Sequence, residues 1–359
     1  MLRAGAILLV LLHHYWVAVQ QLPGERWVAA GWARMLWAPW EFGYLGVKLF
    51  FVISGFCIHL SFLNWRGQRP AGGAFWRPFL AEFFWRRFWR IYPPYLGALL
   101  LFYALQYAEP LSFAALRHLG VHGLLLNHLS PAFFLNINPS FWSIAVEWQL
   151  YLIYPLFLWL ALATRVEVAF ALASLVAFFF QFVAPHFTAS YVVLRSPFAY
   201  WFEWVIGALI AELFVNRRRL FPALPGLTAA LGLAAVWVHV FTGSSAAQYF
   251  LPTLFFARLM ERWLHAQVPL LRLERGLVPL GLCSYSVYLF HQPYLGWVVK
   301  RTASWQASAA ALPVWFLLPM LALIPLLLGC WGYYRWVERT SITTGRRIWE
   351  RRVAMRRSP

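Results

Sequence analysis

The chain consists mostly of apolar runs of about twenty residues, and these runs limit its fold more than any other feature. A run of this length crosses the ~30 Å hydrocarbon core of a bilayer, where a backbone without water must form a helix to satisfy its own polar groups. We therefore predict an all-α polytopic membrane protein. The predicted spans lie near residues 4–21, 43–63, 89–108, 140–162, 166–186, 197–215, 221–241, 245–261, 278–299 and 311–333.

Composition and charge agree with a membrane protein. Of the 359 residues, 62% are hydrophobic and only 12% are charged, whereas soluble domains carry about 25% charged residues. A net charge of +18 is compatible with nucleic-acid binding. The basic residues, however, form short clusters between the apolar runs, which is the positive-inside pattern of membrane proteins. We expect the lipid bilayer, and no nucleic acid, as a partner.

The basic residues also predict the orientation. With ten spans and a cytoplasmic N-terminus, 23 of the 30 lysines and arginines fall on the cytoplasmic side. Both termini are therefore predicted to be cytoplasmic, in a multi-pass protein of a bacterial inner membrane. We expect a transmembrane domain over residues 1–334 and a basic cytoplasmic tail over residues 335–359, which lies along the anionic inner leaflet.

The first span carries ionisable groups at both ends of an apolar stretch. Arg3 and His14 are eleven residues apart, which on an α-helix places them on one face, about 16 Å apart along the axis. His14 then lies near the membrane midplane, and His13 points about 100° away. Arg3 snorkelling beside a packed His14 is the simpler explanation, but ionisable groups inside membranes are candidate functional sites.

A cluster of arginines precedes the third span, in the sequence EFFWRRFWRIYPPY. Arg87 lies three residues and Arg86 four residues before Arg90, so the three arginines share a helix face. Positive-inside topology alone accounts for isolated arginines at such a place. Guanidinium groups also bind phosphate bidentately, so the cluster is a candidate site for a nucleotide-bearing acyl carrier such as acyl-CoA.

Two later spans carry polar stripes. Ser143, Glu147 and Tyr151 recur every four residues on one face of the fourth span. Glu147 is expected at nearly the depth of His14, where the two side chains can form an acid–base pair. A structural ion pair with an arginine or lysine is the alternative.

The ninth span carries Ser284, Tyr288 and His291 on one face. His291 is expected on the outer side of the midplane, where Pro293 opens the backbone.

We expect no metal site and no bound haem. His118 and His122 are four residues apart, but no acid or cysteine accompanies them in the sequence. Cys57, Cys283 and Cys330 all lie in apolar runs and are expected to be packing residues without disulfide bonds.

Taken in order, five motifs resemble those of the acyltransferase family 3 membrane proteins, which are O-acyltransferases of polysaccharides and small molecules. The motifs are Arg3-x10-His14, GVKLFFVISGF at 46–56, RFWR at 87–90 followed by IYPPY, WSIAVEWQLY at 142–151 and SYSVYLFHQP at 284–293. Lys48 departs from the pattern, because many members of the family have an acid there. The resemblance therefore assigns no role to Lys48.

The resemblance implies an O-acetyltransferase-like enzyme of the cell envelope. Such an enzyme moves an acyl group, often acetyl, from cytoplasmic acyl-CoA to a hydroxyl of an extracytoplasmic glycan or other acceptor. Acetyl-CoA is then a donor substrate, and no cofactor is bound permanently. By matching position, Arg3 and His14 correspond to the essential Arg–His pair of the family, Arg87 and Arg90 to its RxxR motif, and Glu147 to its acid in the fourth span.

These considerations predict a role for each candidate residue. Arg86, Arg87 and Arg90, with help from Arg3, bind the phosphates of the donor. His14 acts as a general base or is transiently acylated, and Glu147 orients or charges its imidazole. The acceptor side is lined by Ser143, Tyr285 and His291.

Two other classes of protein stay open. A transporter or flippase of a lipid-linked glycan also places polar residues inside the membrane, but it carries inverted repeats with matching broken helices, and none is visible in the sequence. A non-catalytic protein that senses acyl-CoA keeps the arginines and tolerates the loss of His14 and Glu147.

Overall fold

The computed structural model describes residues 1–21, 40–68, 75–241, 245–266, 272–308 and 312–355. Over this part of the chain it is all-helical and contains no strand. Each predicted span overlaps a helix. These helices are α1 (Leu2–Gln20), α3 (Leu45–Gly67), α4 (Trp76–Gln106), α7 (Phe141–Ala163), α8 (Val166–Phe178), α10 (Trp201–Val215), α11 (Leu227–Phe241), α12 (Ser245–His265), α14 (Ser284–Ser308) and α15 (Leu312–Tyr333).

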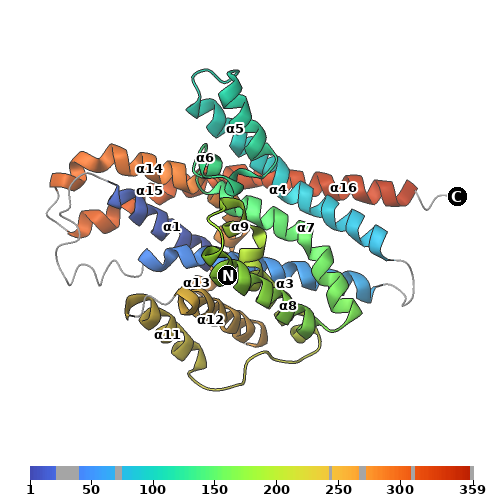
Figure 1. Cartoon of the computed structure of the whole chain (residues 1–359). Coiled ribbons are helices and arrows are strands. Elements are labelled where there is room, and N and C mark those ends of the chain that lie inside the picture. The colour runs from blue at the N-terminus through green and yellow to red at the C-terminus, as the bar shows by residue number, and fades with distance from the viewer. Residues whose placement is uncertain (22–39, 69–74, 242–244, 267–271, 309–311, 356–359) are drawn as a thin grey trace.

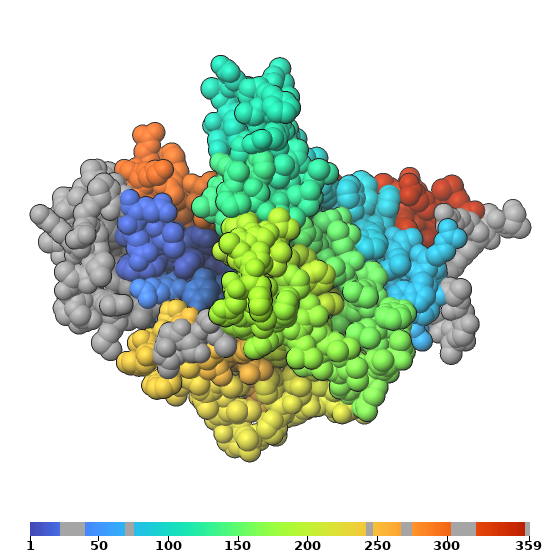
Figure 2. Space-filling view, viewed as in Figure 1, coloured from blue at the N-terminus to red at the C-terminus, as the bar shows by residue number. Residues whose placement is uncertain are grey.

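In the described part of the chain, five segments are long and apolar enough to cross a membrane. They are Leu2–Gln20, Phe42–Gly67, Phe141–Ala163, Val166–His186 and Tyr191–Val215. The all-helical fold is thereby confirmed over the described residues, while the count of ten spans and the orientation stay predictions. The shorter elements include α5 (Phe113–Gly123), α6 (Pro131–Phe134), α13 (Arg272–Leu282), the π-helical turn η7 (Tyr334–Glu338) and α16 (Arg339–Met355). The segment with α5 and α6 projects from the helical body (Figure 2).

The closest helix contact joins α3 and α10. A Cβ atom on Gly55 would lie 1.8 Å from the backbone oxygen of Trp204, and one on Gly207 would lie 2.0 Å from that of Val52. The two backbones therefore touch, and only glycine fits at these positions, as is common where membrane helices pack. This contact fixes α3 in the centre of the molecule, where α1 packs against its other side.

Lys48 is paired inside this bundle. Its Nζ lies 2.6 Å from Oε1 of Glu203 on α10 and 4.0 Å from the centroid of the Tyr249 ring. The hydroxyl of Tyr249 donates a hydrogen bond to the same carboxylate. A buried lysine is costly in a membrane unless it is paired, and this pairing accounts for Lys48 as a structural residue.

The segment after residue 334 continues as η7 and α16, and α16 packs along α4. Figure 1 shows α16 beside α4, on the flank opposite to the outer part of α14 and α15. Pro93 has no N–H, so the carbonyl of Trp89 loses its partner within helix α4. The hydroxyl of Ser341 on α16 donates to this carbonyl, and Nε1 of Trp85 donates to the carbonyl of Gly345 at 2.7 Å. The predicted tail is therefore a docked helix over Arg339–Met355.

Candidate active site

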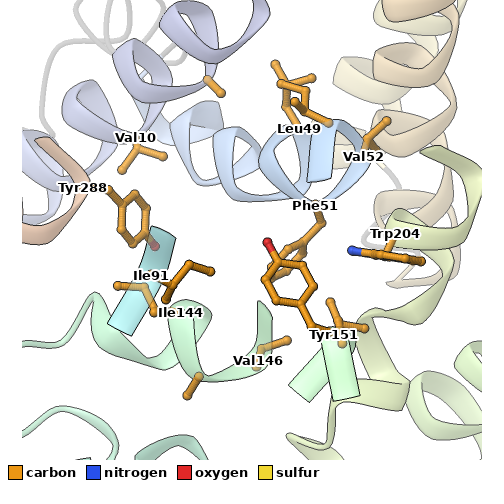
Figure 3. Packing of buried hydrophobic residues seen from close by; sticks show 14 of the residues in the cluster. Val10, Leu49, Phe51, Val52, Ile91, Ile144, Val146, Tyr151, Trp204 and Tyr288 are labelled. Carbon is orange, nitrogen blue, oxygen red and sulfur yellow. The ribbon is translucent and has the colours of Figure 1, made fainter. Parts of the chain in front are cut away.

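A cavity with both polar and apolar walls opens between α1, α3, α4, α7 and α14. Its polar lining consists of Arg3, Ser54, Arg90, Ser143, Glu147, Tyr151, Ser284, Tyr285 and Tyr288. The polar stripes predicted on spans four and nine therefore meet at one place. Figure 3 shows this region, with Tyr151 and Tyr288 approaching from two sides and the apolar Ile91 and Ile144 beside Tyr288.

Glu147 is held by two hydroxyl groups. The hydroxyl of Tyr151, one helix turn away, donates to its Oε1 at 2.5 Å, and Oγ of Ser54 on α3 donates to the same atom at 2.8 Å. The charge of Glu147 also attracts Arg3 and Arg87. Ser54 was not among the predicted site residues, although it stands next to Gly55, where the helices come closest.

The arginines divide between two places. No hydrogen bond or ion pair joins Arg3 or Arg90 to another described side chain, and both line the cavity. The guanidinium of Arg87 lies 5.9 Å from the centroid of the Tyr151 ring, and its Nε is buried without a partner among the described residues. Arg86 forms an ion pair with Glu82, and 56% of its side chain is exposed. Arg86 therefore points away from this cavity.

His14 forms a pair with His291. Nδ1 of His14 lies 3.2 Å from Nε2 of His291 and 2.9 Å from the carbonyl oxygen of Val10, while Nδ1 of His291 lies 2.8 Å from the carbonyl oxygen of Tyr288. A carbonyl only accepts, so we assign the proton of each ring to Nδ1. His14 then donates to both Val10 and His291, and its Nε2 keeps a free lone pair.

A proline in α14 leaves a carbonyl near this pair unpaired, and a side chain outside the helix binds it. Pro293 deprives the carbonyl of Leu289 of its helical partner, and Nδ2 of Asn138 donates to that carbonyl at 2.8 Å. Oδ1 of Asn138 accepts from the backbone N–H of Ser140 at 3.0 Å, at the start of α7. Oγ of Ser140 lies 3.5 Å from Nε2 of His291. The backbone carbonyl that Pro293 leaves unpaired is thus bound by Asn138, which the sequence analysis did not identify.

Ser143, Tyr288 and Tyr285 connect the cavity to the helices around it. The hydroxyls of Ser143 and Tyr288 lie 2.6 Å apart, and the centroid of the Tyr288 ring lies 5.1 Å from that of His291. The hydroxyl of Tyr285 donates to the carbonyl of Ile91 on α4 at 2.9 Å. Tyr285 therefore lies beside Arg90, nearer to the arginines than its predicted place on the acceptor side.

The expected contact between Glu147 and His14 is not formed. Among the described residues, Glu147 bonds to Ser54 and Tyr151, and His14 bonds to Val10 and His291. The physical reason lies in the packing, because α1 lies against α3 and α14, so that His14 meets α14. The sequence predicts that Glu147 and His14 lie at nearly the same depth in the membrane. Depth alone does not determine which groups they bond to.

Glu338 is a charged residue that the sequence analysis placed in the tail. It is 1% exposed, its Oε2 accepts from Ser286 at 2.6 Å, and its Oε1 has no partner among the described residues. Its charge interacts with those of Arg90 and Arg3. The signal for it in the sequence is slight, being one acid within a strongly basic segment.

His122 of the projecting segment has structural partners. Nδ1 of His122 lies 2.8 Å from the carbonyl oxygen of His118, and its Nε2 lies 3.0 Å from that of Asn136. In the described part of the chain, no three histidine, cysteine, aspartate or glutamate side chains gather closely enough to hold a metal ion.

Comparison with known proteins identifies the family. A family model described as an acyltransferase domain, Acyl_transf_3, matches residues 1–335 and so includes all five motifs. No curated protein and no solved structure matches the chain. The apolar helices and the family together make the chain an integral membrane protein. The cavity, with its arginines, its carboxylate and its nearby histidine pair, therefore lies in a chain that belongs to acyltransferase family 3.

Proposed function

We propose that this protein moves an acyl group, acetyl in the first instance, from cytoplasmic acyl-CoA to a hydroxyl of an extracytoplasmic glycan or other acceptor. The observation that carries the proposal is the series of polar groups from Arg3 and Arg90, past Glu147 and Tyr288, to His14 and His291. Acyl transfer from a phosphate-bearing donor needs cations at one end of such a series and a base at the other.

The arginines form the donor end in this proposal. Arg3 and Arg90 line the cavity without an ion pair among the described residues, so their guanidinium groups are free to bind phosphate. Arg87 contributes through its buried Nε. Glu147 is the counter-charge that keeps these cations together when no donor is bound. Acyl-CoA is a substrate here, and no permanently bound cofactor is invoked.

His14 is the base at the other end. Its Nε2 accepts the proton of the acceptor hydroxyl while the hydroxyl oxygen bonds to the thioester carbon and the carbon–sulfur bond breaks. The proton then passes from His14 to the departing thiolate of CoA. His291 accepts from Nδ1–H of His14 and so holds the tautomer with a free Nε2. Transient acylation of Nε2 uses the same geometry.

The orientation of the protein in the membrane follows from these proposed roles of the arginines and His14. The arginine-rich end faces the cytoplasm, where acyl-CoA is available, and the histidine end is reached by the acceptor from outside. This orientation matches the positive-inside rule with both termini cytoplasmic in a bacterial inner membrane. The enzyme thereby carries an acyl group across the bilayer without exporting CoA.

The test uses purified protein in nanodiscs with radiolabelled acetyl-CoA. We expect His14→Ala to lower thioester loss at least ~100-fold, because general-base catalysis contributes about that much or more. Arg90→Ala is expected to weaken donor binding. His13→Ala is the matched control, because His13 is the neighbouring histidine and makes no hydrogen bond to His291.

Full activity of His14→Ala would overturn the mechanism. Binding of CoA that is insensitive to His14→Ala and never followed by turnover would favour a protein that senses acyl-CoA. Absence of CoA binding in the wild type would favour a transporter.

A further inference from the structure

A groove runs between α4 and α16, next to the cavity. It is lined by Arg86, Arg87, Trp89, Arg90, Ile342, Gly345, Arg346, Trp349 and Glu350. Its volume is about 470 Å³, within the range of roughly 300–1,000 Å³ that is typical of small-molecule sites. The wall from Ile342 to Glu350 lies beyond residue 335, where the family match ends. This wall is therefore a feature of this chain outside the matched domain.

The charge of the groove favours an anion. Its lining contains four arginines and one glutamate. Arg346 forms an ion pair with Glu350 at 2.7 Å, but 79% of its side chain is exposed, so water screens the pair and the guanidinium stays available. The other three arginines come from the RRFWR sequence of α4.

Two residues that line the groove carry buried donors without an acceptor among the described residues. Nε of Arg87 and Nε1 of Trp89 are both buried, and neither has a hydrogen-bond partner among the described residues. Leaving a buried donor unpaired costs about 1–3 kcal/mol. An acceptor oxygen of a ligand, such as one of a phosphate, would satisfy either donor that it reached.

The α16 wall is held rigidly against α4. Ser341 donates to the carbonyl that Pro93 leaves unpaired, and Gly345 packs so closely that a Cβ there would lie 2.3 Å from Cγ of Trp89. Figure 2 shows the two helices in contact on one flank of the molecule. The backbone that carries Arg346 and Trp349 is therefore fixed beside α4, which lowers the entropic cost of binding a ligand.

The groove and the cavity share one residue, since Arg90 lines both. We propose that the groove binds the nucleotide diphosphate of the acyl-CoA donor, with Arg346 on the phosphates and the Trp349 indole against the base. The acylated pantetheine arm of the donor then runs past Arg90 into the cavity. This inference rests on the proposed function, and it makes α16 a part of the donor site.

The test measures CoA affinity by titration calorimetry on the full chain in phosphatidylcholine nanodiscs. Arg346→Gln is expected to weaken CoA binding about tenfold, because it removes one charge-assisted hydrogen bond. The KM for acetyl-CoA is expected to rise by the same factor, whereas the KM for acetyl-pantetheine, which lacks the nucleotide, is expected not to respond. Trp349→Leu is expected to act in the same direction. Arg347→Gln is the matched control, because it removes the same charge from an exposed neighbour that does not line the groove.

Equal effects of Arg346→Gln and Arg347→Gln would overturn the proposal, because they would reflect overall charge alone. An effect of Arg346→Gln that appears only when phosphatidylglycerol is added would also overturn it and assign the groove to a lipid headgroup, the other source of phosphate. Unchanged CoA affinity in Arg346→Gln and Trp349→Leu, with a loss in Arg90→Ala, would reject the role of α16 and keep the proposed function. Absence of CoA binding in the wild type would reject both.

Discussion

At the scale of single residues, the chemistry of His14 depends on hydrogen bonds made by its neighbours. His291 is fully buried, and its Nε2 is a lone-pair acceptor because its Nδ1 is committed to the carbonyl of Tyr288. It can therefore accept from His14 without competing as a base. Residues that orient a catalytic imidazole in this way set its tautomer and its direction.

This arrangement predicts that different substitutions of His291 lower turnover by different amounts. We expect His291→Phe to lower turnover roughly tenfold or more, because the tautomer of His14 is no longer held. The KM for acyl-CoA is expected to stay within about twofold, since the donor arginines are untouched. His291→Gln, whose Oε1 can accept from His14, is expected to recover part of the loss. Steady-state kinetics of the two variants checks the order, and equal loss in both would reject the assigned role.

At the scale of helices, the contact between α3 and α10 tolerates no side chain. A Cβ on Gly207 overlaps the backbone oxygen of Val52, so Gly207→Ala must push the helices apart. We expect a loss of stability of about 1–3 kcal/mol or more, as for an overpacked core. Gly329→Ala is the control, because nothing lies within 4 Å of the added atom. Thermal unfolding in detergent should separate the two variants, and equal melting temperatures would contradict the close contact.

The helices also show what could be predicted from sequence. Apolar length predicts where each helix lies, and the spacing of Ser143, Glu147 and Tyr151 predicts which face is polar. Helical periodicity says nothing about which helix a face will meet, and for that reason the partner of His14 was missed. Ser54 and Asn138 were missed for a related reason, because one looks like a packing residue and the other lies in a loop.

At the scale of the whole molecule, the distribution of basic residues predicts that both termini lie on the cytoplasmic side. A green fluorescent protein fused after residue 359 is therefore expected to fluoresce in intact bacteria, and an alkaline phosphatase fused there is expected to be inactive. A reporter pair fused in the loop near residue 195, which is predicted to be outside, should show the opposite pattern. A periplasmic C-terminus would require an odd number of spans and would reject the orientation that the donor site needs.

The bond between Ser341 and Trp89 has a consequence for biosynthesis. The two residues are 252 positions apart, so helix α4 enters the membrane long before the ribosome makes the hydroxyl that satisfies its open carbonyl. During that interval the carbonyl must rely on water or on other passing groups. The arginine-bearing part of α4 consequently reaches its final form only when α16 has been made and has docked. The nascent protein therefore holds its membrane helices for some time before it holds a finished donor site.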